Sequence, residues 1–284
     1  MAMSIAVTGA TGRLGGRVAR RLAEAGQPIT LLVRNPGRAP ELPGALAVSA
    51  EYGNRPAVQS ALSGMDTVLM VSAAETPNRV ELHRSFIDAA AAAGIGHLVY
   101  TSFYGAARDA SFTLARDHWA TEQHIRATGA ATGMTFTFLR DNLYADFMPA
   151  LVGTDGIIRG PAGDGRVAVV AQDDIAEAAV TVLTAPGEHS GATYDLTGPQ
   201  ALSLTEIAAV LAEATGKPVT YHPETLAEAY ASRASYGAEA WQVDAWVSTY
   251  TAIAAGELAG VTDAIPTLTG HPATSLAELL RRPS

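Results

Sequence analysis

Three glycines near the start of the chain have the spacing of a phosphate-binding turn. The stretch reads Ser4-Ile5-Ala6-Val7-Thr8-Gly9-Ala10-Thr11-Gly12-Arg13-Leu14-Gly15-Gly16, an apolar strand that runs into a glycine turn and then into a helical pattern. In a βαβ unit these glycines give a tight turn, a close backbone approach and a close helix-to-strand contact, with helix N–H groups aimed at a pyrophosphate. The sequence therefore predicts a dinucleotide site with cofactor contacts at Gly9, Ala10, Thr11, Gly12, Arg13, Leu14 and Gly15.

Arg34 is the second informative position, because it directly follows the apolar run 29–33. About 20 residues beyond the glycines, an NAD-binding unit carries Asp or Glu for the ribose hydroxyls, whereas the 2′-phosphate of NADP needs a cation. No acid appears here before Glu41. We therefore expect NADP(H) as the cofactor, with Arg13 as a candidate helper. The alternative is that Arg34 is an ordinary solvated arginine.

Residues after two further predicted strands are also expected near the cofactor. Tyr52 follows the strand 45–49, where an adenine ring would lie, and it either covers that ring or is a buried structural tyrosine. Ser72 and Ala73 follow the predicted strand 67–71, and their small side chains would let the backbone pass close to the pyrophosphate and the nicotinamide ribose.

The region where a short-chain dehydrogenase carries its proton-transfer residues is unusual. Ser102 ends the predicted strand 97–102 at the position of the catalytic serine, but the Tyr-x-x-x-Lys motif is absent from the next helix, where His118 and Glu122 take the i and i+4 positions. His118 is a candidate proton donor, because imidazole titrates near neutrality and Glu122 could orient it or raise its pKa. Tyr104 is a second candidate. The alternative is an ordinary helical side-chain pair.

A last group of candidates follows the predicted strand 135–139. Asn142 and Tyr144 come at its carboxyl end, where a nicotinamide carboxamide or ribose would lie, and Arg140 is expected beside them as a cofactor contact. Asn142 could instead cap the helical segment that runs to Leu151.

The elements that must position these residues alternate between strand and helix along the first half of the chain. With right-handed crossovers, this alternation predicts an α/β fold with a doubly wound parallel Rossmann-type sheet and a small α/β C-terminal lobe. Capping boxes that begin at Ser203 and Ser275 indicate helices in that lobe. We expect an NADP-binding Rossmann domain over 1–150, to which 167–197 return, and a small substrate-cleft lobe over 198–284 together with 151–166.

Composition narrows the class further. The 284 residues are 48% hydrophobic and 17% charged, which excludes disordered and fibrous proteins, and a formal net charge of −9 gives no electrostatic footprint for nucleic acid or an anionic membrane. With no cysteine, disulfides, thiolate nucleophiles and Cys-ligated metals are excluded, and no metal site is expected. Residues 1–8 do not read as a signal peptide and no run of about 18 apolar residues appears, so neither export nor membrane insertion is expected. We expect a cytoplasmic monomer or homodimer that binds a small apolar or aromatic substrate.

With these residues in view, the chain resembles the NmrA-like atypical short-chain dehydrogenases, most closely the subgroup that contains bacterial NAD(P)H:quinone oxidoreductase 2 and triphenylmethane reductase. The resemblance spans nearly the whole length. Glu51 and Asn54 depart from it, because quinone-reductase relatives usually carry Asp there. The motifs that support it are Thr8 to Gly15, Val33-Arg34-Asn35-Pro36, Tyr52-Gly53, Tyr100-Thr101-Ser102, Asp117-His118 with Thr121-Glu122, Leu139-Arg140 with Asn142 and Tyr144, Ala162-Gly163-Asp164-Gly165, and Gly270-His271-Pro272.

The resemblance implies an NADPH-binding Rossmann domain, a small lobe that encloses the substrate cleft, and direct hydride transfer to a quinone or a similar conjugated acceptor without flavin. Such an acceptor takes a hydride readily, which would explain the missing Tyr-x-x-x-Lys. The alternative is an NADP-binding redox sensor of the NmrA regulator type, which turns nothing over. Only that alternative would involve nucleic acid.

Overall fold

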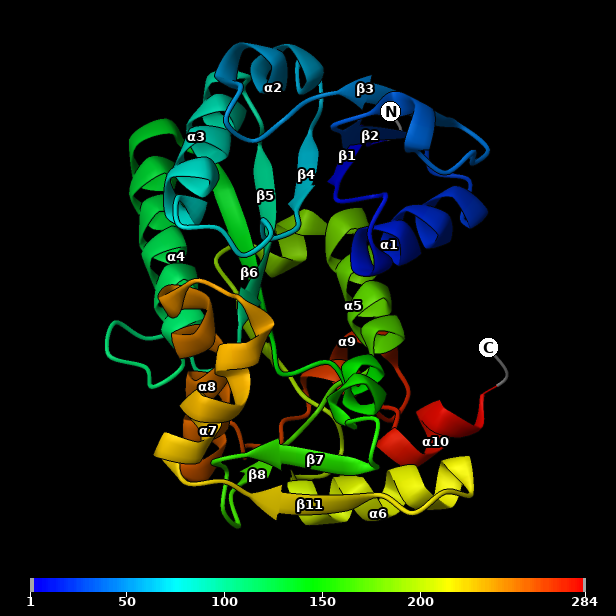
Figure 1. Ribbon diagram of the computed structural model, residues 1–284. Helices are drawn as coiled ribbons and strands as arrows, with labels where there is room; N and C mark the ends of the chain where they lie inside the picture. The colour runs from blue at the N-terminus through cyan, green and yellow to red at the C-terminus, as the bar shows by residue number, and fades with distance from the viewer. Residues whose placement is uncertain (1–2, 283–284) are drawn as a thin grey trace. The chain divides into compact units, whose positions relative to one another are not determined.

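The computed structural model describes residues 3–282, and its main element is a sheet of seven strands in the order β3-β2-β1-β4-β5-β6-β9 (Figure 1). Parallel pairing joins β1 to β2 and β4, β2 to β3, and β4 to β5. The predicted doubly wound Rossmann-type sheet is therefore confirmed. The strands are β1 (Ile5–Thr8), β2 (Ile29–Val33), β3 (Ala45–Ser49), β4 (Thr67–Met70), β5 (His97–Phe103), β6 (Thr135–Asp141) and β9 (Thr193–Leu196).

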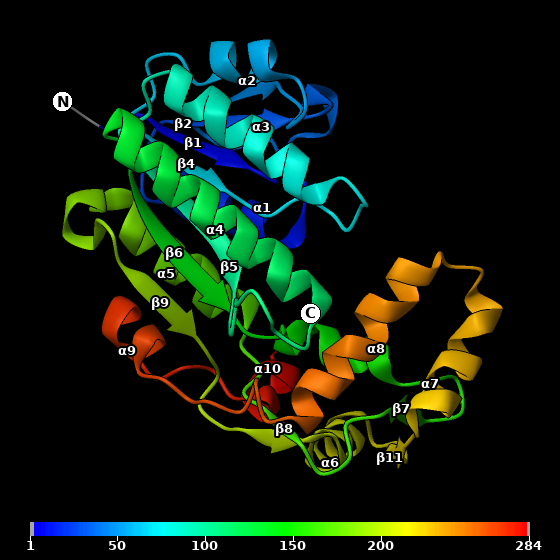
Figure 2. The ribbon, with the colours of Figure 1, turned by 90° about the vertical axis from the view of Figure 1, so that its left-hand side faces the viewer.

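Helices cover both faces of this sheet. In two views, α2, α3 and α4 lie on one face, and α1 and α5 lie on the other (Figures 1 and 2). Strands β1, β2, β4 and β5 are buried along their whole length, as parallel strands covered on both faces must be. The helices are α1 (Arg13–Glu24), α2 (Arg55–Ala61), α3 (Arg79–Ala92), α4 (Thr113–Thr132) and α5 (Gln172–Thr184), with short 3₁₀ helices η1 (Pro36–Arg38) and η3 (Pro186–His189).

The rest of the chain forms two small sheets and five further helices within residues 3–282. Strand β7 (Ile157–Gly160) pairs in parallel with β11 (Thr220–Pro223), and β8 (Arg166–Val167) pairs antiparallel with β10 (Leu202–Ser203). The capping boxes at Ser203 and Ser275 are confirmed, because each hydroxyl accepts the backbone N–H of the glutamate three residues later. The helices are α6 (Leu204–Thr215), α7 (Leu226–Arg233), α8 (Ala240–Ala254), α9 (Ala264–Thr269) and α10 (Leu276–Arg281), with η2 (Ala145–Leu151) and η4 (Ala234–Tyr236).

Backbone proximity divides the chain into two compact units. The first contains residues up to Ser102, then 117–140 and 173–194, and the second contains 103–116, 141–172 and the chain from Asp195 onward. This division differs from the expected boundaries at 103–116, 141–150, 167–172 and 195–197, all of which were expected with the Rossmann domain. The physical reason is burial: Phe112 and Met148 pack in one apolar cluster with Ile207 and Ile253. The functional roles expected of the two parts stay predictions.

No helix among residues 3–282 is long and apolar enough to cross a membrane.

Candidate functional site

Each glycine of the turn after β1 has a separate geometric task. Gly9 has φ +66°, a left-handed conformation that L side chains rarely adopt. A Cβ on Gly15 would lie 2.5 Å from the carbonyl oxygen of Gly9, so Gly15 allows α1 to pack against the end of β1. A Cβ on Gly12 would meet only that same oxygen, at 3.2 Å. Gly12 is therefore the position where a ligand can approach the backbone.

The N-terminus of α1 is suited to an anion. Its N-cap is Gly12, which supplies no side-chain acceptor, and its first turn has no acidic residue. The first N–H groups of the helix therefore receive no cap from the N-cap side chain, and no acid of the first turn offsets the positive end of the helix dipole. Thr11 and Arg13 are exposed, whereas Ala10 and Leu14 are buried and can offer only backbone atoms. This cradle fits the pyrophosphate of a dinucleotide.

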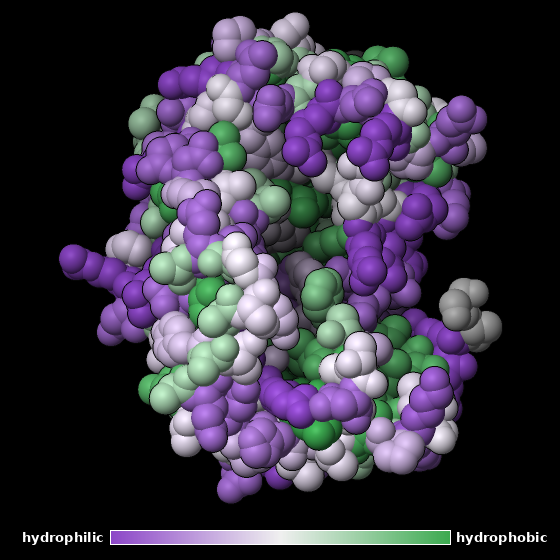
Figure 3. Space-filling view, viewed as in Figure 1, coloured by the Kyte–Doolittle hydropathy of each residue, from purple (hydrophilic) through white to green (hydrophobic). Residues whose placement is uncertain are grey.

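Arg34 follows β2 at its carboxyl end and is exposed. Within residues 3–282 no carboxylate forms an ion pair with its guanidinium, and Asn35 uses its own side chain to cap η1. The space-filling view shows mainly hydrophilic residues over α1 and the region of β2 and β3 (Figure 3). The guanidinium of Arg34 is therefore open to an anion, and its contact with the 2′-phosphate of NADP stays a prediction.

Tyr52 is held in a closed ring of hydrogen bonds at the carboxyl ends of β1 and β4. The Val71 N–H donates to Thr8 Oγ1 (2.8 Å), the Tyr52 hydroxyl donates to the Val71 carbonyl (2.5 Å), and the Tyr52 and Thr8 oxygens are 2.6 Å apart. The Tyr52 ring packs against Phe86, with centroids 4.6 Å apart. Burial raises the pKa of Tyr52. This geometry favours the structural alternative for Tyr52, and its contact with adenine stays a prediction.

The Ser102 hydroxyl points at a buried carboxylate. It donates to Glu122 Oε1 at 2.6 Å, and Arg140 donates to both carboxylate oxygens of Glu122, at 2.8 and 2.7 Å. The Glu122 side chain is 1% exposed. Glu122 thus binds a serine and an arginine, and the fork of Arg140 is engaged by Glu122.

His118 lies in a second buried network. Arg79 Nη2 is 2.9 Å from His118 Nε2, and the Tyr100 hydroxyl is 2.9 Å from His118 Nδ1. Because a guanidinium only donates, Nε2 accepts, and the ring hydrogen is on Nδ1. His118 is 5% exposed, and burial, with the Arg79 charge as a smaller cause, lowers its pKa well below the usual value. The expectation that Glu122 raises this pKa is wrong. Proton donation by His118 stays a prediction that this geometry does not favour.

The remaining candidates belong to the second unit. The Asn142 amide donates to the Leu258 carbonyl at 3.0 Å and its oxygen accepts the Leu143 N–H, so Asn142 does not cap η2, whose N-cap is Tyr144. Tyr104 is partly buried, and burial, together with the charge of Asp195, raises its pKa. The cofactor and catalytic roles of these residues stay predictions.

Asp141, which the sequence analysis did not single out, is a buried carboxyl at the end of β6. It is 1% exposed, Tyr144 donates to its Oδ2 at 3.0 Å, and its Oδ1 has no hydrogen-bond partner within residues 3–282. Burial raises its pKa well above the usual value. An aspartate close to the end of a predicted strand was the available signal.

Asp141→Asn is expected to stabilise the protein at neutral pH but not in acid. A raised folded-state pKa means that the stability contribution is complete below the unfolded value of about 3.9 and is lost as pH rises through the folded value. Asparagine keeps an acceptor for Tyr144 and carries no charge, so the free energy of unfolding should rise by about 1 to 3 kcal/mol near pH 8. Urea unfolding near pH 4 and pH 8 tests this. Equal effects at both pH values would contradict it.

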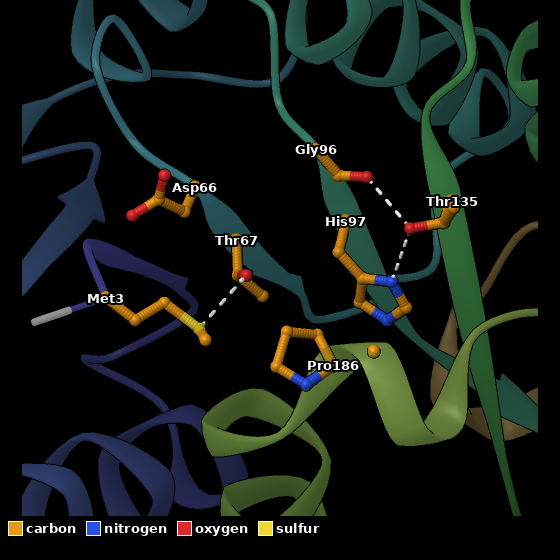
Figure 4. Close-up of a pocket in the computed structure, with 8 residues that line it drawn as sticks. Met3, Asp66, Thr67, Gly96, His97, Thr135 and Pro186 are labelled. Atoms are coloured by element: carbon orange, nitrogen blue, oxygen red, sulfur yellow. Dashed lines mark hydrogen bonds between the residues drawn. The ribbon is translucent and has the colours of Figure 1, made fainter. Parts of the chain in front are cut away.

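A cavity of about 470 Å³ lies at the other end of the sheet (Figure 4). Thr67, His97 and Thr135, the first residues of β4, β5 and β6, line it. His97 bonds Thr135 at 2.8 Å and Thr137 at 2.9 Å, and burial, together with His189, lowers its pKa to about 4. The His97 ring and the Thr135 hydroxyl are paired with each other, and the Thr67 hydroxyl donates to Met3 Sδ. The glycine turn, in contrast, follows the carboxyl end of β1. The cavity is therefore not the expected cofactor site.

The glycine turn, the uncapped helix N-terminus and the exposed Arg34 at the carboxyl edge of the sheet define a Rossmann-type dinucleotide-binding protein. The comparisons with known proteins give the particular family. The chain belongs to the NmrA-like family, whose model matches residues 1–239. The predicted resemblance is confirmed.

Three relatives illustrate how close the similarity is. The chain is 36% identical over 283 residues to quinone oxidoreductase 2 of Escherichia coli (strain K12), with 96% of each chain covered. It is 34% identical over 282 residues to an NAD(P)H azoreductase of Xenophilus azovorans, with 98% of this chain and 96% of that protein covered. The structure of the Citrobacter sp. triphenylmethane reductase complexed with NADP(H) matches with a TM-score of 0.85 and 33% identity, covering 98% of this chain and 99% of that one.

Proposed function

We propose that this protein transfers hydride from NADPH directly to quinone-like or other conjugated apolar acceptors, without flavin. The relatives named for reduction of quinones, azo compounds and triphenylmethane dyes support this proposal, because all three substrate classes are conjugated electron acceptors. The cofactor supplies the hydride when it is bound. The chain supplies the cradle for the pyrophosphate and the cation for the 2′-phosphate.

The observation that carries the proposal is that the residues at the usual proton-transfer positions are hydrogen-bonded to other buried side chains. Ser102 donates to Glu122, Glu122 is engaged by Arg140, and both nitrogens of His118 have buried partners. A simple ketone needs a proton delivered as the hydride arrives, which these three side chains are not placed to provide. A quinone gives a stabilised hydroquinone anion that can take its proton from water.

The cofactor contacts expected at Ser72, Ala73, Asn142 and Tyr144 remain part of this proposal. Val71, which precedes the first two, lies against the turn, since a Cβ on Gly9 would be 3.1 Å from its Cβ. Arg140 is proposed to act by holding Glu122.

Oxidation of NADPH in the presence of different acceptors tests the function. The purified protein should oxidise NADPH with benzoquinones, naphthoquinones or azo dyes, should leave saturated ketones and aldehydes unreduced, and should not need added flavin. Absence of turnover with every acceptor, together with tight binding of both NADP and NADPH, would overturn the proposal and favour a redox sensor.

Arg34→Ala is expected to weaken NADPH binding selectively. Loss of a charge-assisted contact with a phosphate should cost about 1.5 to 3 kcal/mol, roughly ten- to a hundredfold in Kd, whereas NADH binding should change little. Titration of both cofactors by fluorescence measures the two constants. Arg38→Ala is a matched control, because Arg38 is also exposed but is the last residue of η1 and lies four residues further along the chain from the end of β2 than Arg34 does. An equal loss for NADH and NADPH would contradict the assignment.

A further inference from the structure

The backbone that follows β4 is held by side chains. The N–H groups of Val71, Ser72 and Ala73 donate to Thr8 Oγ1, Thr101 Oγ1 and His83 Nε2, at 2.8, 2.9 and 2.8 Å. The strand was expected to continue to Val71, but these bonds replace the sheet ladder and end β4 at Met70.

Two side chains from one turn of α3 form hydrogen bonds to the backbone of Ala73. His83 accepts the Ala73 N–H, and Arg79 Nε donates to the Ala73 carbonyl at 2.9 Å. Arg79 and His83 are four residues apart on α3 and so lie on the same face of that helix. Both polar backbone atoms of Ala73 are therefore fixed by the same turn.

Side chains of helix α4 in turn hold Arg79 and His83. His83 Nδ1 is 2.8 Å from Thr121 Oγ1, whose hydroxyl donates to the Asp117 carbonyl, so the Nδ1–H donates and Nε2 is free to accept from Ala73. Arg79 Nη2 donates to His118 Nε2. Burial, with Arg79 as a smaller cause, lowers the pKa of His83 to about 3, so the ring stays neutral, as this arrangement requires.

The burial of this network is informative. Arg79 is 5% exposed and His83 is fully buried. Taking the Arg79 guanidinium out of water is costly, even with the Asp117 carboxylate 3.7 Å from its Nη1, and an apolar anchor would hold the backbone without that cost. The polar network fixes Ala73 in two directions at once, which apolar packing does not do. The segment it fixes lies against the glycine turn through Val71 and Gly9.

We propose that Arg79 and His83 are positioning residues, which fix residues 71–73 so that the nicotinamide half of the bound cofactor is held in one orientation for hydride transfer. This inference rests on the proposed function, because it takes NADPH as the hydride donor. His118 and Thr121 take part by holding Arg79 and His83, which also gives His118 a role that needs no proton transfer.

His83→Leu and His83→Gln test the proposal together. Leucine leaves the Ala73 N–H unpaired and should lower kcat about tenfold or more, with a smaller rise in the Kd for NADPH and little change in the KM for the quinone. Glutamine offers an acceptor near the position of Nε2 and should restore most of the loss. Thr121→Val, which removes the acceptor for the Nδ1–H, should reproduce part of the effect and serves if His83→Leu does not fold.

His97→Leu is the matched control. His97 is 4% exposed and is bonded to two threonines in the same sheet, but at the amino ends of the strands. It should lower the thermal midpoint while leaving kcat and NADPH affinity unchanged. The inference would be overturned if His83→Leu kept the kcat and NADPH affinity of the wild type, or if His97→Leu lost as much of both. The proposed function would still stand in either case, as long as the wild-type protein reduces the acceptor. If the wild type binds NADPH but reduces no acceptor, the function fails, and the Kd values of the variants still test the positioning.

Discussion

Replacing Gly12 with alanine is expected to abolish most NADPH binding while leaving the fold intact. The added Cβ would lie 3.2 Å from the Gly9 carbonyl oxygen, a tight contact that a small shift can relieve. The same methyl group would stand where the pyrophosphate must approach the start of α1. Steric insertion of this kind costs about 1 to 3 kcal/mol, so the Kd for NADPH should rise roughly ten- to a hundredfold.

Gly15→Ala is the matched comparison, because a methyl group added at this position should destabilise the fold. Its Cβ would lie 2.5 Å from the Gly9 oxygen and 2.6 Å from the Thr8 oxygen, and backbone atoms cannot move aside as a side chain can. Thermal unfolding and NADPH titration of both variants separate the two effects. We expect a lowered midpoint for Gly15→Ala and a near-normal midpoint with weak binding for Gly12→Ala. Normal NADPH affinity in Gly12→Ala would contradict the assignment of the cradle.

The contrast between these glycines shows how far sequence reasoning reaches. Spacing predicts the turn, since a strand, a glycine at positive φ and a helix must follow in that order, and the strands 29–33 and 45–49 are found as predicted. The turn and the strands can be predicted because they depend on residues that are close together in the sequence. The βαβ geometry also predicts that Gly15 is crowded by the strand, whereas Gly12 is open to the pyrophosphate.

The buried polar networks could not be predicted in the same way. His118 and Glu122 share one helical face, and their spacing indicated a pair, but their strongest partners come from other elements: Arg79 on α3, and Ser102 and Arg140 on neighbouring strands. Which distant side chain reaches a buried group depends on the packing of whole elements. The spacing of Arg79 and His83 on α3 was the one local signal, and nothing in the sequence shows that the pair faces the end of β4.

Arg140→Met is expected to be the most destabilising single change at the Glu122 network. It leaves the buried Glu122 carboxylate, 1% exposed, with the Ser102 hydroxyl but without its two bonds to the guanidinium. An uncompensated buried charge costs about 3 to 5 kcal/mol, a large part of the stability of a typical domain.

The double variant Glu122→Gln with Arg140→Met distinguishes an arginine that supports the fold from one that touches the cofactor. Glutamine carries no charge and keeps an oxygen for the Ser102 hydroxyl, so the free energy of unfolding should recover most of the loss, as is common when a buried ion pair is replaced as a unit. If Arg140 acts only by holding Glu122, NADPH affinity should recover with stability. A stable double variant that binds NADPH poorly would instead place Arg140 in direct contact with the cofactor, and urea unfolding combined with NADPH titration decides between the two.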